Sequence, residues 1–392
     1  MQRGLKMKLA DRSDLKRQNR RTVYEYIQGA PGQTASGVQI SRDTGISLPT
    51  VLRILEYFTG YGLLKAVEMP QNGSSAVGRR PTLLQFVPRR YLNVGLAYDS
   101  TFLELSLMDL NSKVLASDRF RAQGSVEELM GTVIGDRLDA FLKKAGVASE
   151  NLLSIGLSLP VVLNTQKCTA DMPAPRIHLS EGFDFLPYCR ALSGKYGCPI
   201  FMENDVNAAA VAEFKERGLS ADDDLVYIAL GNGIGSGILL QGKLRYGSDY
   251  GAGEIGDMPV GYPSFSSGGG VETLEASLTP DVFMRMFYYN VFEDHDSDSE
   301  TIVRVSDYVA RLLSYAILQM KAILDVDTFV LGGFVTDQLK SHLFPMLDHY
   351  LALEVRICPS VSPVRSPFAA SRGAGALAGD QALENLLTRD DG

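Results

Sequence analysis

The 392-residue sequence has no apolar run near the roughly 20 residues that a membrane-spanning helix requires. Its first residues, MQRGLKMKLADRSDLKRQ, are too polar for a secretory signal peptide. Four cysteines and four histidines are scattered along the chain, without the Cys-x-x-Cys or His-x-x-x-His spacing of zinc sites. We therefore expect a cytoplasmic protein with free thiols, no disulfide, no metal and no membrane partner.

The composition is that of a globular protein, with 45% hydrophobic and 21% charged residues. A chain of this length exceeds what one hydrophobic core organises, so two or three folding units are expected. The net charge of −8 is unevenly distributed, because residues 1–90 contain 15 Lys or Arg and only 6 Asp or Glu. A basic head on an acidic body favours binding to the phosphates of nucleic acid. The alternative, a solvated basic tail, explains residues 3–21 but not the later basic residues.

Segment 15–58 predicts three helices, of which the last two are joined by a tight turn. The first helix would cover residues 15–27. Ser36 can cap a second helix that stops near Gly45, and Ser47 can cap a third. The third helix carries an apolar stripe of Val51, Ile54, Leu55 and Phe58. Two short helices in this arrangement form a helix-turn-helix, whose second helix can lie in the major groove of DNA.

Residues 64–87 predict a hairpin that would form a wing beside these helices. Loosely alternating apolar residues begin at Leu64, are interrupted by the turn-rich QNGSS, and then resume. Arg79 and Arg80 precede Pro81, and the residue before a proline avoids the helical region. Arginines in an extended segment suit a narrow minor groove, where the negative potential is strong. A three-helix protein-interaction module is the alternative to a DNA-binding head.

After residue 91 strands alternate with helices, which is typical of an α/β architecture with two lobes around a cleft. The expected helices cover residues 126–145, 206–217 and 302–324. The expected strands are LNVGLAY, FLELSLMDL, KVLASDRF, LLSIGLSL, CPIFMEN, DLVYIAL, SGILLQG and DTFVLGG.

Three motifs in this body carry chemistry. In the first, Asn204 and Asp205 follow a strand, where a carboxylate at a helix start can take a proton from a sugar hydroxyl. Such a pair is more often a helix cap. The second motif is the glycine turn at residues 231–235, whose amides could approach an anion, although such glycines serve hairpins equally well. The third is Gly-Glu-Ile-Gly at residues 253–256, followed by Glu272.

In this order and at these distances, the motifs resemble the ROK family of repressors, open reading frames and kinases. The N-terminal sequences TGISLPTVLRIL and GRRPTLL resemble the winged helix of the regulators in that family. The resemblance implies a winged helix-turn-helix over residues 1–88, followed by a two-lobed, actin-like, sugar kinase-like fold. Its lobes would cover residues 89–198 and 199–392.

The resemblance also implies two sets of contact residues. Those expected to face DNA are Ser47, Leu48, Pro49, Thr50 and Arg53, with Arg79 and Arg80 in the wing. Those expected to contact a sugar are Asn204, Asp205, Glu254, Asp257 and Glu272. Carboxylates and an amide can accept and donate hydrogen bonds around a ring of hydroxyls. The alternative is that these side chains are relics that cap helices or face solvent.

The chain departs from the family at the turn that cradles the phosphates of ATP. The family has Asp-x-Gly-Gly-Thr there, whereas this chain has Ala97-Tyr98-Asp99-Ser100-Thr101. Amides that approach a phosphate need glycine, which has no Cβ and reaches the required dihedral angles. We therefore expect neither ATP binding nor kinase activity, although Asp205 occupies the position of the family's catalytic base.

A second departure removes the family's structural zinc site. Asp257, Pro263, Phe265 and Gly270 stand where the family has one histidine and three cysteines. Without thiolate and imidazole donors, no zinc is expected. Arg176 replaces an asparagine that the family often has near the sugar. It could pair with a carboxylate or phosphate of the ligand, or neutralise the acidic residues of the cleft.

The sequence therefore predicts a transcriptional regulator of carbohydrate genes, most simply a repressor. It would bind a double-stranded DNA operator as a homodimer or a dimer of dimers, and a sugar or sugar derivative would be its effector. Two alternatives stay open: an active sugar kinase with a DNA-binding head, and a regulator controlled by a protein partner.

Overall fold

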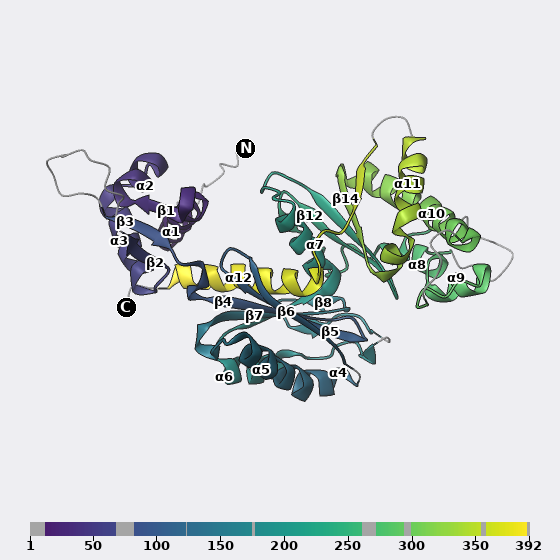
Figure 1. Cartoon of the computed structure of the whole chain (residues 1–392), viewed down its shortest axis with the longest axis horizontal. Coiled ribbons are helices and arrows are strands. Elements are labelled where there is room, and N and C mark those ends of the chain that lie inside the picture. Colours follow the sequence, from purple (N-terminus) through teal and green to yellow (C-terminus); the bar gives the residue numbers. More distant parts are fainter. Residues whose placement is uncertain are drawn as a thin grey trace, which may run out of the picture.

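The computed structural model describes residues 12–67, 82–122, 124–174, 177–260, 272–293, 299–353 and 358–389. They form a small N-terminal head and two larger lobes, each built on a five-stranded sheet (Figure 1). The expected α/β class and the winged head are confirmed. In this part of the chain, no helix is both long and apolar enough to cross a membrane.

The head is a winged helix-turn-helix. Its helices are α1 (Arg12–Gly29), α2 (Gly37–Thr44) and α3 (Leu48–Gly60). Its sheet has the order β1-β3-β2, with β1 (Thr34–Ser36), β2 (Leu64–Val67) and β3 (Leu83–Phe86). Ser36 caps α2 as predicted, because its hydroxyl accepts from the amide of Gln39 at 3.3 Å. Gly45 ends α2 in the left-handed conformation with φ of 73°, which glycine adopts readily. The apolar stripe of α3 is buried in the core of the head.

The first lobe contains the sheet β10-β7-β4-β5-β6, in which β4, β7 and β10 are parallel. Its strands are β4 (Leu92–Tyr98), β5 (Phe102–Asp109), β6 (Val114–Arg121), β7 (Leu152–Leu159) and β10 (Ile200–Asn204). Helices α4 (Val126–Glu128), α5 (Ile134–Ala145) and α6 (Leu186–Tyr196) cover one face of this sheet (Figure 1). A short hairpin of β8 (Leu163–Asn164) and β9 (Thr169–Ala170) precedes α6.

The second lobe contains the sheet β13-β12-β11-β14-β15. Its strands are β11 (Leu225–Leu230), β12 (Ile234–Leu240), β13 (Lys243–Leu244), β14 (Thr328–Gly332) and β15 (Ser360–Pro363). The helices of this half are α7 (Asp205–Glu216), α8 (Leu274–Ser277), α9 (Pro280–Phe287), α10 (Glu300–Leu324) and α11 (Phe334–Ala352). All eight strands expected in the body are therefore present.

The last helix, α12 (Ala369–Thr388), returns to the first lobe and lies with α7 between the two sheets (Figure 1). Glycines permit this close packing: a Cβ on Gly156 of β7 would lie only 2.0 Å from the carbonyl oxygen of Ala374. The far end of α12 reaches the head, where Leu386 and Leu387 join its core. The expected division at residues 198 and 199 stays a prediction, and β10, which follows it, pairs with β7 in the first sheet.

Candidate functional site

The junction of β10 and α7 forms one wall of a small cavity at the expected cleft, and the segments of Ser236 and Glu254 form the opposite wall. Asn204 caps α7, because its Oδ1 accepts from the amides of Val206 at 2.9 Å and Asn207 at 3.0 Å. Its Nδ2 donates to the carbonyl oxygen of Val161 at 3.0 Å, at the edge of the first lobe. The amide side chain therefore fixes the start of the helix that carries Asp205, and it also lines a small cavity.

Asp205 has the side-chain chemistry of a proton acceptor. Burial raises the pKa of its carboxyl to about 7, and the negative charges of Asp99 and Glu254 act in the same direction. A hydrogen bond from the amide of Val206, at 2.9 Å, opposes this shift in pKa. A carboxyl with a pKa near neutrality can both accept and release a proton at physiological pH.

Sequence reasoning missed the buried carboxylate beside this pair, Glu203. Its Oε1 accepts from the amide of Asn204 at 2.9 Å and from Nδ2 of Asn207 at 3.1 Å. Its Oε2 accepts from the hydroxyl of Tyr246 at 2.8 Å. Burial raises the pKa of Glu203, although these three hydrogen bonds act in the opposite direction. The network joins β10 and α7 of one wall to the segment that follows β13.

Glu254 lies on the opposite wall, and its position depends on Gly253. Gly253 has φ of 97°, and a Cβ there would lie 1.9 Å from the carbonyl oxygen of Ser236, so the turn requires glycine. Both the amide and the hydroxyl of Ser236 donate to the carbonyl of Gly253, at 2.7 and 3.0 Å. The Glu254 carboxylate is reachable by solvent, yet desolvation raises its pKa, with further contributions from Asp257 and Glu275.

The glycine turn at residues 231–235 connects β11 to β12 as a hairpin. The amide of Gly231 donates to the carbonyl of Gly233 at 3.0 Å. The amide of Ile234 donates to Oε2 of Glu275 at 3.1 Å. Glu275, for which no role was predicted, therefore links this hairpin to the start of α8. The hairpin interpretation of these glycines is the one that the hydrogen bonds support.

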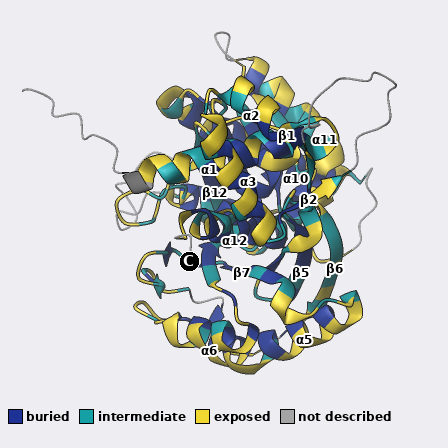
Figure 2. Cartoon of the chain, turned by 90° about the vertical axis from the view of Figure 1, so that its left-hand side faces the viewer, coloured by how far each residue is buried: buried dark blue, intermediate teal, exposed yellow. Residues whose placement is uncertain are grey.

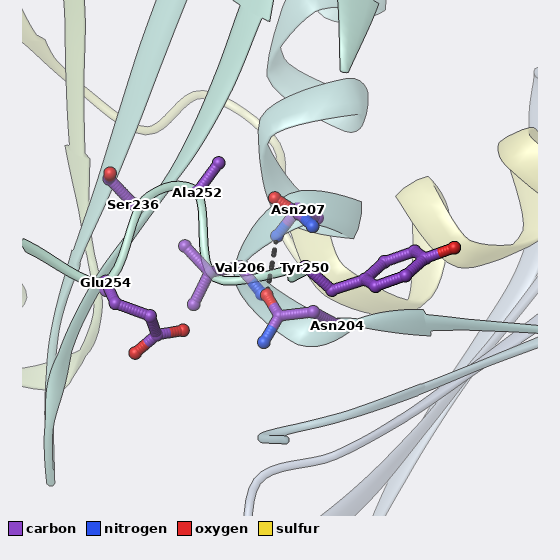
Figure 3. A pocket seen from close by; sticks show the side chains of 8 residues that line it. Asn204, Val206, Asn207, Ser236, Tyr250, Ala252 and Glu254 are labelled. Carbon is purple, nitrogen blue, oxygen red and sulfur yellow. Dashed lines mark hydrogen bonds between the residues drawn. The ribbon is translucent and has the colours of Figure 1, made fainter. Parts of the chain in front are cut away.

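Side chains from both walls enclose a cavity of about 20 Å³, which has room for about one water molecule (Figure 3). The residues that line it are Asn204, Val206, Asn207, Gly235, Ser236, Tyr250, Ala252 and Glu254. Figure 3 shows Asn204 and Glu254 approaching the cavity from different segments of the chain. Ser236 and Tyr250 are polar lining residues that the sequence did not single out.

Asp205, Asp257 and Glu272 do not line this cavity, although Asp205 is close enough to Glu254 for the charge of Glu254 to raise its pKa. Asp257 is exposed at the end of the short 3-10 helix Ile255–Asp257. Glu272 is also exposed, and its Oε1 accepts from the hydroxyl of Ser277 at 3.0 Å. Arg176 lies outside the described residues. The structure thus brings Asn204, Asp205 and Glu254 together, and holds Asp257 and Glu272 further along the same wall.

The turn that departs from the family's phosphate-binding sequence is closed by its own side chain. Oδ1 of Asp99 accepts from the amides of Thr101 at 2.9 Å and Phe102 at 2.6 Å. Ser100 adopts a φ of 77°, in the region that favours glycine. An anionic acceptor of the chain itself therefore occupies two of the turn's amides.

The start of α3 presents an accessible surface of mixed polarity. Ser47, Leu48, Pro49 and Arg53 are exposed and Thr50 is partly exposed. Exposed and buried positions alternate along this helix, and the buried stripe faces the hydrophobic core of the head (Figure 2). The Ser47 hydroxyl does not cap a backbone amide as predicted, because it pairs with the Thr50 hydroxyl at 2.8 Å. Arg79 and Arg80 lie outside the described residues.

Within the described ranges, no three His, Cys, Asp or Glu side chains come close enough to hold a metal ion. Of the positions that replace the family's zinc ligands, Pro263, Phe265 and Gly270 lie outside those ranges. Asp257 is described and is exposed.

Comparison with known proteins gives a consistent result. The xylose repressor of Bacillus subtilis is 23% identical over 257 residues, which cover 65% of this chain and 64% of that protein. The chain thus spans somewhat less than two thirds of the length of this relative. A crystal structure of a ROK family transcriptional regulator, a homolog of the Escherichia coli MLC protein, superposes with a TM-score of 0.72 at 19% identity. The match covers 95% of this chain and 98% of that chain.

The body alone also superposes on an enzyme, the ROK hexokinase from Thermus thermophilus. The TM-score is 0.57 at 23% identity, and the match covers 74% of this chain and 99% of that chain. These likenesses establish the winged head followed by a two-lobed, actin-like, sugar kinase-like body as the fold. The sequence profile of the ROK family matches residues 93–381, and the chain therefore belongs to the ROK family.

Proposed function

We propose that the chain is a transcriptional repressor of carbohydrate genes that binds a DNA operator and senses a sugar or sugar derivative. One observation carries the proposal: a winged helix-turn-helix is joined to a ROK body in a single chain. The names of the relatives, a xylose repressor and a ROK transcriptional regulator, support it.

We propose that Ser47, Leu48, Pro49, Thr50 and Arg53 contact the operator, with Arg79 and Arg80 in the wing. The accessible start of α3 supports this assignment, because recognition helices contact bases through their N-terminal residues. A homodimer or a dimer of dimers would present paired recognition helices to a palindromic site.

The proposed effector contacts are Asn204, Asp205, Glu254, Asp257, Glu272 and Arg176. The cavity between the walls has room for about one water molecule, far less than a sugar needs. A sugar that bridged Asn204 and Glu254, which both line this cavity, would therefore bind a more open arrangement of the two walls. Such a ligand can change DNA affinity only if it prefers one arrangement over the other.

The absence of phosphoryl transfer is part of the proposal. Its support is the Asp99 carboxylate, which already holds the amides of Thr101 and Phe102. One observation favours the alternative, an active sugar kinase: the pKa of Asp205 is raised to about 7, as suits a general base. A coupled assay with ATP and a panel of hexoses separates the two. Turnover that disappears in Asp205→Asn would establish the kinase.

Operator binding tests the main proposal. The purified chain is titrated against the DNA upstream of its own gene and neighbouring genes, with random DNA for comparison. Arg53→Ala should weaken specific binding by about 1 to 3 kcal/mol and reduce the slope of log K against log salt by about 1. The matched control is Arg190→Ala, which removes an exposed arginine on α6, far from the head, and should leave binding unchanged.

Sugars, amino sugars and sugar acids are then added to the protein–DNA complex. Release by one of them with pure protein would exclude the need for a protein partner. Binding to random DNA as tight as to any upstream fragment, with no response to salt, would contradict the proposed function.

A further inference from the structure

Two cysteines that are 21 residues apart meet beside the cleft. Cys168 lies in the turn between β8 and β9, and Cys189 lies in the first half of α6. Their Sγ atoms are 3.8 Å apart, and the Sγ of Cys168 is also 3.6 Å from the Sδ of Met202 on β10. Both thiols are free in the structure.

The backbone holds the two cysteines in this position. The amide of Phe185 donates to the carbonyl of Cys168 at 2.9 Å, and the amide of Cys189 donates to the carbonyl of Phe185 at 3.0 Å. Phe185 is thus hydrogen-bonded to the backbone of both cysteines. A disulfide needs a sulfur–sulfur separation of about 2.05 Å, so the two sulfur atoms, now 3.8 Å apart, must move closer together for the bond to form.

The two thiols differ in burial and in the direction in which their pKa is shifted. Cys168 is half-buried, whereas Cys189 is only 6% exposed. A hydrogen bond in which either thiol can be the donor joins the two sulfurs, and this contact lowers the pKa of Cys168 while burial opposes the shift. The pKa of Cys189 is raised by the same contact and by burial. A thiolate therefore forms first on Cys168, the more accessible sulfur.

We propose that Cys168 and Cys189 form a reversible disulfide when the protein reacts with hydrogen peroxide. This disulfide would link the β8–β9 hairpin covalently to α6. The Cys168 thiolate attacks one peroxide oxygen, the O–O bond breaks, and the departing hydroxide takes a proton and leaves as water. The Cys189 sulfur then attacks the Cys168 sulfenic acid, the S–O bond breaks, and a second water leaves. The two thiols lose two electrons and two protons to the peroxide.

The disulfide would restrain a segment that borders the effector cleft. Val161 lies two residues before β8, and its carbonyl accepts from Nδ2 of Asn204, the cap of α7. Met202, which touches Cys168, lies two residues before Asn204 on the same strand. Oxidation therefore acts on the hairpin and on the end of β10 together.

Peptide mapping of the full chain tests the proposal without DNA or sugar. The reduced protein is treated with a small molar excess of hydrogen peroxide, quenched with an alkylating reagent and digested. We expect a pair of peptides linked through Cys168 and Cys189, whose mass is the sum of the two thiol peptides less two hydrogen atoms. Dithiothreitol should break this link. Cys358→Ser removes the exposed fourth cysteine and should retain the link, as should Cys198→Ser.

Two variants test the order of the steps. Cys168→Ser should lose the link entirely, and Cys189→Ala should stop at a sulfenic acid that dimedone traps on Cys168. If one of these variants fails to fold, peptide mapping of the unaltered chain still tests whether the disulfide forms. Both thiols remaining alkylatable at peroxide concentrations that oxidise Cys358 would overturn it, as would a link through any other cysteine.

Discussion

At the scale of the residue, three carboxylates of the candidate site have environments that disfavour their ionisation. The pKa values of Glu203, Asp205 and Glu254 are raised, in each case mainly by burial. For Asp205 and Glu254, neighbouring negative charges add to this effect. A ligand that donates hydrogen bonds to these groups would replace the water they have lost. The folded state carries a free-energy cost at neutral pH until such a ligand binds.

Replacement of Asp205 by asparagine should make this cost visible. The folded-state pKa of about 7 lies above the ordinary value of 3.8, so the folded state binds the proton more tightly. The free energy of unfolding of the unaltered chain therefore falls as pH rises from about 4 to about 7. Asp205→Asn does not titrate, and at pH 8 it should be more stable by about 1 to 2 kcal/mol, a value reduced for partial solvent exposure.

Urea unfolding at several pH values, followed by circular dichroism, measures the difference in free energy of unfolding between the two proteins, which should vanish near pH 4. As a control, Asp118 has a pKa that is shifted in the opposite direction, because a hydrogen bond from Lys144 lowers it. Asp118→Asn should slightly lower stability above pH 4 and have no effect well below it. Equal stability of Asp205→Asn and the unaltered chain at pH 8 would contradict the prediction.

At the scale of the element, α12 is built from small residues because it passes through a narrow space. Gly373, Gly375 and Gly379 come within contact of α7 and β4. A Cβ on Gly373 would lie 1.6 Å from the carbonyl oxygen of Ala208, and one on Gly375 would lie 2.8 Å from the amide nitrogen of Gly95. Backbone atoms cannot move aside as a flexible side chain does, so any added carbon displaces the helix.

Gly373→Ala should therefore destabilise the protein by at least about 3 kcal/mol, despite the higher helix propensity of alanine. The matched control is Gly194→Ala in the exposed part of α6, where an added Cβ meets nothing within 4 Å. That change should stabilise the protein by about 0.5 to 1 kcal/mol. Thermal unfolding of both variants measures the contrast, and similar effects of the two substitutions would rule out the packing explanation.

At the scale of the whole molecule, α12 is also one of the contacts between body and head, beside the hydrogen bonds of Gln28 and Gln33 to Asn111. The side chain of Arg20 on α1 is 2% exposed and lies over the ring of Tyr57, 3.6 Å from its centroid. It donates to the carbonyls of Leu387 at 2.9 Å and Arg389 at 2.7 Å. The hydroxyl of Tyr57 donates to the carbonyl of Leu386 at 2.6 Å. Side chains of the head thus satisfy the last carbonyls of α12.

Loss of Arg20 should release the head from α12. Arg20→Ala removes two charge-assisted hydrogen bonds and leaves buried carbonyls without a donor, at a cost of about 3 kcal/mol. Amide hydrogen exchange in α1 and the last turn of α12 should become about 100-fold faster, while exchange in β4 and β7 stays unchanged. The neighbouring Arg21 is 58% exposed and pairs with Glu384, so Arg21→Ala should cost less than about 1 kcal/mol. Indistinguishable exchange in the two variants would refute the assignment.

The sequence by itself determined what depends on near neighbours in the chain. The cap at Ser36, the turn at Gly45 and the buried stripe of α3 follow from local hydrogen bonding and helical periodicity. Eight of the ten strands in the two large sheets follow from short apolar runs, whereas β13 and β15 were not predicted. The resemblance to the family predicted that Asn204, Asp205 and Glu254 belong to one site, because the order and spacing of the family motifs are linked to the fold.

Only the tertiary structure decided what depends on residues distant in sequence. Nothing local in the sequence indicates that Glu203 accepts from the Tyr246 hydroxyl or that Glu275 accepts from the amide of Ile234. Nothing near Cys168 predicts its contact with Cys189. The course of α12 between two sheets and into the head is set by surfaces contributed from the whole chain. Periodicity identifies which face of an element is buried, whereas the partner that covers it is chosen by shape and by unsatisfied polar groups, which appear only when the chain is folded.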